Sequence, residues 1–106
     1  MITQDPFFFD QRVPLAELAA RSRIPAVYGF PEYVRAGGLL SYGSSPADAQ
    51  ATLGRYVARI LAGTPPADLP VWQAVKIELA LNIKAARELG LTFPTALLGR
   101  ADEVVE

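Results

Sequence analysis

The hydrophobic and polar positions change period several times along this chain of 106 residues. The strongest helical pattern covers residues 46–61, where Ser45 can cap the start, Pro46 suits the first helical position and Gly63 ends the helix. Its expected buried stripe consists of Ala49, Leu53, Tyr56, Val57, Ile60 and Leu61. A period of two over residues 75–81 predicts a strand with one face better buried than the other.

Shorter elements are expected before the long helix. An aromatic loop over Asp5–Asp10 precedes a helix that has Pro14 in its first turn. The buried stripe of that helix should comprise Leu15, Leu18 and Ala19. Apolar runs predict strands at 24–28 and 39–42, and between them Pro31 opens a short helix that Gly37 and Gly38 end.

Beyond the last strand, Asn82 is expected to cap a helix over 83–89, and a further helical turn should surround 96–98. Strands and helices therefore alternate, which predicts an α/β layer structure with some parallel strands. The chain supplies about three strands, whereas sheets hold about five or six. The pattern indicates the end of a larger fold, whose open sheet edges would remain unpaired.

Composition excludes several function classes. Net charge is −1, and the charged residues, 20% of the chain, are mixed in sign, so no nucleic-acid surface is expected. Cysteine and histidine are both absent, which excludes disulfides, thiolate chemistry and histidine catalysis and argues against a metal site. We expect no cofactor.

The apolar runs are too short to span a bilayer. Residues 1–6 lack the basic and hydrophobic regions of a signal peptide, so no export signal is expected in this chain. Residues 1–6 therefore do not indicate in which cellular compartment the protein works.

Eight stretches of the chain carry a resemblance to a known family. They are Asp5-Pro6-Phe7-Phe8-Phe9, Ile24-Pro25-Ala26-Val27-Tyr28, Ala36-Gly37-Gly38-Leu39-Leu40-Ser41-Tyr42-Gly43, Tyr56-Val57-Ala58-Arg59-Ile60-Leu61-Ala62-Gly63, Pro66-Ala67-Asp68-Leu69-Pro70-Val71, Leu81-Asn82-Ile83-Lys84-Ala85-Ala86, Leu89-Gly90-Leu91-Thr92 and Arg100-Ala101-Asp102-Glu103-Val104. In their order and spacing the sequence resembles the ABC transporter substrate-binding family related to the tryptophan/tyrosine-type binding proteins.

The resemblance implies the C-terminal part of a two-lobed fold like that of the type I periplasmic binding proteins. Such proteins work outside the cytoplasm, capture a small molecule between the lobes and deliver it to an ABC permease. By this analogy residues 1–38 form a strand and helix segment of the second lobe. Residues 39–74 supply a hinge strand, a first-lobe helix and a Pro-rich linker, and residues 75–106 supply the return strand, a helix and the tail.

Ligands in this architecture sit at the carboxyl ends of strands, between the lobes. Asp5 could accept a hydrogen bond from a ligand amine while Phe7 stacks on the ligand; alternatively, Asp5 caps a turn and the phenyl ring is core. At the hinge, Tyr42 could donate to a ligand carboxylate and Gly43 would allow close backbone approach, or both simply end a strand.

Two further candidates follow the strand at 24–28. Phe30 could form a wall of the cleft and Glu32 could meet a cationic group, although Glu32 would also suit a helix N-terminus. Trp72 is the one tryptophan, and packing is the favoured role for it.

Three functions compete. The favoured one is solute capture, possible ligands including amino acids, without catalysis. A carboxylate-based enzyme using Asp5, Asp10 or Glu32 is disfavoured, because no paired-carboxylate spacing, phosphate loop or nucleophile elbow is present. The alternative is a truncated or vestigial interaction module that forms a homo-oligomer by strand pairing or domain exchange, with residues 64–70 as the hinge.

Overall fold

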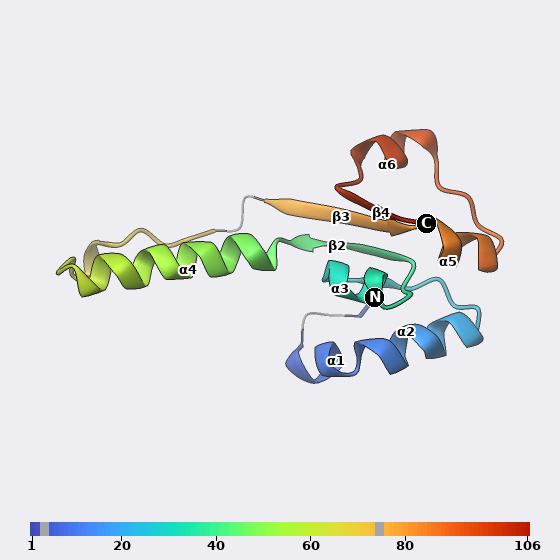
Figure 1. Cartoon of the computed structure of the whole chain (residues 1–106), viewed down its shortest axis with the longest axis horizontal. Coiled ribbons are helices and arrows are strands. Elements are labelled where there is room, and N and C mark those ends of the chain that lie inside the picture. The colour runs from blue at the N-terminus through green and yellow to red at the C-terminus, as the bar shows by residue number, and fades with distance from the viewer. Residues whose placement is uncertain (3–4, 74–75) are drawn as a thin grey trace. The chain divides into compact units, whose positions relative to one another are not determined.

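The computed structural model describes residues 1–2, 5–73 and 76–106. Helices and strands alternate along the chain (Figure 1), which confirms the predicted α/β class. The chain divides into two compact units. Unit 1 comprises Met1–Gly43 and Glu78–Glu106, and unit 2 comprises Ser44–Ile77.

The described residues form a sheet of four strands in the order β1-β2-β3-β4. Its strands are β1 (Val27–Tyr28), β2 (Leu40–Ser44), β3 (Ile77–Asn82) and β4 (Glu103–Val105). The outer pairs β1–β2 and β3–β4 are parallel. The arrows of β2 and β3 run in opposite directions (Figure 1). The chain therefore leaves unit 1 along β2 and returns along β3.

The sequence predicts three strands, and the structure adds β4. Three residues are too short for a strand period to be visible, so only pairing with β3 defines β4. The predicted strand at 24–28 is wrong in length. Its first half is excluded because Arg23 adopts a left-handed φ of 53° and Pro25 has no N–H to donate, and Ile24 is 58% exposed.

The aromatic segment after Asp5 is a helix, α1 (Pro6–Asp10), and the predicted loop is wrong. Asp5 Oδ1 accepts a hydrogen bond from the Phe7 backbone N–H at 2.9 Å, and Pro6 occupies the first helical position. The same combination of a capping side chain and a following proline, at Ser45 and Pro46, predicts the long helix over 46–61.

The helix predicted around Pro14 is α2 (Arg12–Arg21), but its buried stripe differs from the prediction. Leu18 is 57% exposed, and Ala16 is the buried residue of this helix. The small Ala16 is therefore the covered position, where α2 packs beside α3, while the larger Leu18 lies outside.

The predicted short helix is α3 (Pro31–Arg35), and it ends as expected at Gly37, whose φ of 110° is left-handed. After β3 come α5 (Ile83–Glu88) and α6 (Thr95–Arg100), which confirm the two helical turns expected there.

Unit 2 contains the long helix α4 (Pro46–Leu61) and a 3₁₀ turn, η1 (Pro66–Asp68). The predicted cap is confirmed, because Ser45 Oγ accepts from the Asp48 backbone N–H at 3.2 Å. The predicted burial is wrong, since four stripe residues are exposed: Leu53, Val57, Ile60 and Leu61. A helical period places the apolar residues on one face of the helix, but that face is buried only where another helix or strand packs against it.

Strand β3 also departs from its predicted alternation. Leu79, Ala80, Leu81 and Asn82 are all buried, so the carboxyl half of the strand is covered on both faces. The sheet neighbours β2 and β4 flank this half, as expected for a central strand. Val75, the first residue of the predicted strand, lies outside the described residues.

Asn82 joins four elements at the end of β3. Its backbone N–H donates to the Leu39 carbonyl beside β2 at 2.9 Å. Its side-chain Nδ2 donates to the Val34 carbonyl of α3 at 3.2 Å, and Oδ1 accepts from the Ala85 N–H of α5 at 2.9 Å. Because the side chain is 5% exposed, water cannot readily replace these partners.

A surface ion pair connects α3 with β4. Arg35 donates Nε and Nη2 to the two carboxylate oxygens of Glu103, both at 2.9 Å. This hydrogen bonding is the main cause of the raised pKa of Arg35. Both side chains are partly exposed, so we assign the pair a small contribution, below about 1 kcal/mol.

The Asn82 contacts generate a stability prediction. Asn82→Ala should lower the free energy of unfolding by about 2–3 kcal/mol, because it removes the α5 cap and leaves the Val34 carbonyl buried without its donor. Ser45→Ala, which removes a cap alone, should cost about 1 kcal/mol. Urea unfolding followed by circular dichroism measures both, and equal losses would contradict the bridging role of Asn82.

Candidate functional site

The carboxyl ends of three parallel segments meet at one edge of unit 1. Ile2 forms an isolated parallel bridge with Tyr28, and β1 pairs in parallel with β2 in the register Tyr28↔Ser41. The segments that follow Ile2 and Tyr28, and the far end of β2, therefore lie at the same edge. We refer to it as the carboxyl edge.

Asp5 and Phe7 follow the first of these segments. Asp5 is exposed and uses one carboxylate oxygen to cap α1, so its second oxygen remains for another partner. Phe7 is 68% exposed, which excludes a core role for its ring. Phe7 contacts Phe8 edge to face at a centroid distance of 5.9 Å.

An aromatic cluster follows β1. Phe30 packs edge to face on Phe9 with ring centroids 5.5 Å apart, and Phe9 meets Tyr33 at 6.3 Å. Tyr33 stacks on Tyr28 at 4.7 Å. A Cβ on Gly38 would lie 2.7 Å from Cε2 of Tyr28, so the stack depends on glycine at that position. Phe30 thus belongs to a packed aromatic cluster, in which Tyr28 and Tyr33 are buried, and is not the single wall residue that the sequence suggests.

Arg12 lies on this cluster, and nothing in the sequence singles it out. Its guanidinium carbon is 4.7 Å from the centroid of the Phe9 ring, and its Nη1 donates to the Phe9 carbonyl at 3.1 Å. A lone arginine at a helix start carries no distinguishing signal. Arg12 and Phe9 come together because the segment between Asp5 and Arg12 is the helix α1 and not a loop.

The Tyr33 hydroxyl is buried and has no hydrogen-bond partner among the described residues. Burial raises the pKa of Tyr33, the Arg12 charge opposes that rise, and the Asp5 charge adds to it. Burial also raises the pKa of Tyr28, with a contribution from Tyr33. Asp5 and Arg12 are therefore both close enough to Tyr33 to influence the pKa of its hydroxyl, in opposite directions.

The remaining predicted residues are less closely grouped. Glu32 is in the first turn of α3 with Oε1 3.8 Å from Nη1 of Arg35, and its Oε2 is buried without a hydrogen bond to any described residue. Tyr42 is 59% exposed within β2, and Gly43 is the last residue of unit 1 before the chain enters unit 2. Strand β2 runs one residue beyond Gly43, where the sequence predicts its end.

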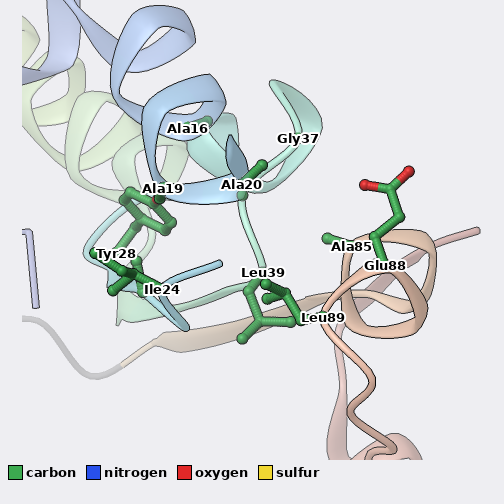
Figure 2. A pocket seen from close by; sticks show the side chains of 12 residues that line it. Ala16, Ala19, Ala20, Ile24, Tyr28, Gly37, Leu39, Ala85, Glu88 and Leu89 are labelled. Atoms are coloured by element: carbon green, nitrogen blue, oxygen red, sulfur yellow. The ribbon is translucent and has the colours of Figure 1, made fainter. Parts of the chain in front are cut away.

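Hollows also lie elsewhere in unit 1. One, of about 20 Å³, is lined mainly by alanines of α2 and α5 with Tyr28 and Leu39; Glu88 at its rim points away from Leu39 (Figure 2). It has room for about one water molecule. A groove of about 330 Å³ runs beside Ile2, and a hollow of about 270 Å³ lies between α5 and α6. The six predicted residues do not line these hollows.

Within the described residues no group of three or more acidic side chains is placed to hold a metal ion. Nor does any helix in the described ranges combine the length and apolar character needed to cross a bilayer.

Comparison with known families identifies the chain. The family described as ABC transporter substrate binding protein matches residues 2–105. The chain belongs to this family, whose members bind small molecules outside the cytoplasm for transporters, and the resemblance found in the sequence is confirmed. Among curated proteins, none matches this sequence.

Solved structures agree with the family. A conserved domain protein from Vibrio cholerae is similar over 96% of this chain at 29% identity, with a TM-score of 0.87. The ABC domain in complex with L-Trp from Streptococcus pneumoniae is similar over 85% of this chain at 30% identity, with a TM-score of 0.75. A ligand-free, open substrate-binding protein from Clostridium difficile, at 19% identity over 97% of this chain and a TM-score of 0.64, shares the fold.

This chain spans about a third of the length of those structures, between 31% and 34%. What the whole relatives bind and contact is therefore carried to this chain only as a proposal.

The buried tyrosines generate a prediction about alkaline stability. Tyrosine in the unfolded chain ionises with a pKa near 10.0, whereas Tyr33 in the folded chain holds its proton to higher pH. The stability associated with Tyr33 is fully present below pH 10 and should be lost as pH rises through the folded pKa.

Thermal unfolding between pH 8 and 12 tests this, since Tyr33→Phe should show a shallower fall in Tm than the wild type above pH about 10. Tyr42→Phe, which changes an exposed ring, is the matched control and should follow the wild type. Parallel curves for all three proteins would contradict the prediction.

Proposed function

We propose that this chain is a solute-binding component of an ABC importer, or the part of one that carries the second-lobe half of its site. In this proposal a small molecule is held between two lobes without catalysis, and the loaded protein docks on an ABC permease outside the cytoplasm. Family membership supports the class, and the carboxyl edge is the observation that supports the site.

The proposed lobes correspond to the two units. Residues 1–38 with the tail belong to the second lobe, and the segment around α4 belongs to the first. Residues near Gly43 and in β3 are then the hinge crossings, since these are the strands along which the chain passes between the units. The proposed domain boundary at residue 75 lies outside the described residues.

The proposed ligand contacts are distributed along the carboxyl edge. They are Asp5, Phe7, Phe30, Glu32, Tyr42 and Gly43. Exposed aromatic rings beside a free carboxylate oxygen suit a ligand that has both an apolar ring and an amine. L-Trp, with which one relative was solved, has those features, so an aromatic amino acid is the ligand class that we propose for this chain.

Glu32 is the weakest of the six positions. Arg35 already lies 3.8 Å from one of its oxygens, so a cationic ligand group would have to compete with that contact. Among the described residues, no arginine or lysine forms an ion pair with Asp5. Its hydrogen bond with the Phe7 N–H uses a single carboxylate oxygen, so the other oxygen can meet a ligand amine. We therefore assign recognition of a ligand amine to Asp5.

Asp5→Asn tests this assignment, since the amide oxygen can still cap α1 while the negative charge is lost. The dissociation constant for L-tryptophan, measured by NMR titration, should rise about tenfold or more, with Tm nearly unchanged. Asp10→Asn, which removes a carboxylate later in α1, is the matched control and should bind as the wild type does. Equal binding by wild type and Asp5→Asn would refute the role of Asp5.

A second candidate function is self-association of a chain that has no transport activity. The groove of about 330 Å³ supports it, since it lies beside the edge formed by Ile2 and is lined by Leu15, Leu18 and Ile24. Exposed apolar surface next to an open strand edge favours pairing with a second copy. The exposed stripe of α4 adds a further apolar surface within unit 2.

Light scattering after size exclusion tests association at several protein concentrations. Self-association predicts a dimer that Leu18→Glu converts to monomer, because the charge would be buried in the groove. Leu91→Glu, at a similarly exposed site in another hollow, is the control and should leave the dimer intact. A monomer at every concentration would exclude this candidate.

A further inference from the structure

Arg12 is held in a fixed position on the carboxyl edge. Its guanidinium stacks over the Phe9 ring at 4.7 Å, and one N–H donates to the Phe9 carbonyl at 3.1 Å. The side chain is partly buried, so part of its cost of desolvation is already met in the free protein. A stacked arginine loses little conformational freedom when it binds a partner.

The charge of Arg12 has no carboxylate partner among the described residues. The ion pairs seen within 4.0 Å among the described residues, such as those of Arg35 with Glu32 and Glu103, do not include Arg12. A guanidinium offers five donors in a planar fork, and one of them bonds the Phe9 carbonyl. The rest of the fork matches the two oxygens of a carboxylate.

Two opposite charges and a buried hydroxyl lie near the same aromatic cluster. Asp5 and Arg12 both act electrostatically on the Tyr33 hydroxyl, which is buried and has no partner among the described residues. Phe9 contacts Arg12, Phe30 and Tyr33, and its backbone N–H donates to the Asp5 carbonyl at 2.9 Å, so the anion and the cation both adjoin this ring cluster. A negative site, a positive site and an aromatic wall fit the three parts of an aromatic amino acid.

We infer that Arg12 is the specificity-determining residue for the ligand carboxylate, and that it acts together with Asp5 beside the Phe9 and Phe30 rings. This rests on the proposed function, because it assigns the acidic end of the ligand whose amine was assigned to Asp5. The site thereby selects zwitterionic amino acids over amines that have the same ring. Phe9 contributes by fixing the guanidinium and by packing against Phe30 in a T-shaped pair.

Two ligands that differ in one group test the inference. L-Tryptophan has the ring, the amine and the carboxylate, whereas tryptamine lacks only the carboxylate. Arg12→Gln in the full chain should weaken L-tryptophan binding about tenfold to a hundredfold and leave tryptamine binding within about twofold of the wild type. Arg12→Lys should be intermediate for L-tryptophan, since a lysine keeps the charge but not the planar fork.

The matched control is Arg21→Gln, at the other end of α2 and exposed. It should bind both ligands as the wild type does. Asp5→Asn should weaken both ligands, because both have the amine. Dissociation constants come from NMR titration, and the circular dichroism spectrum and Tm of each variant establish that it is folded.

The outcomes separate the inference from the function on which it rests. If the wild type binds L-tryptophan and Arg12→Gln binds it equally well, the inference is overturned and solute binding stands. Equal weakening of L-tryptophan and tryptamine by Arg12→Gln also overturns it, because Arg12 would then act only through the packing of Phe9. If the wild type binds neither L-tryptophan, L-tyrosine nor L-phenylalanine, both the inference and the proposed ligand class fail.

Discussion

The hydrogen bonds of Asn82 are the constraint on which unit 1 depends. The carboxyl half of β3 is buried on both faces, so a polar side chain at its end must find partners within the protein. Asn82 meets this requirement by donating to α3 and accepting from α5, while its backbone pairs beside β2. One residue therefore fixes two helices against the central strand of the sheet.

The candidate site follows from this arrangement. Once α3 is fixed at its Val34 carbonyl, Tyr33 is held against Tyr28 and Phe9, and the stack requires the open position at Gly38. The parallel pairing of Ile2, β1 and β2 then brings Asp5 and the aromatic cluster to one edge. The geometry of that edge therefore depends on the buried side-chain amide of Asn82.

Unit 2 is stabilised in a different way. Its helix has strong local signals at both ends, namely the Ser45 cap and the left-handed Gly63. Most of its apolar stripe is nevertheless exposed, and a hydrogen bond from Tyr56 to the Pro70 carbonyl connects the helix to the following loop. Local helix signals define this element even where tertiary burial is small.

Sequence alone determined the α/β class, the family and the features set by neighbouring residues. Caps at Ser45 and Asn82 and stops at Gly37 and Gly63 are predictable because each needs only a few adjacent residues. The cap at Asp5 has the same local chemistry, but three successive phenylalanines show no helical period, and the helix that follows the cap is therefore not predictable from them.

Only the tertiary structure decided which apolar residues are covered, that β4 pairs with β3, and that Arg12 lies on Phe9. These features depend on segments that meet in space, and neither periodicity nor local propensity contains that information.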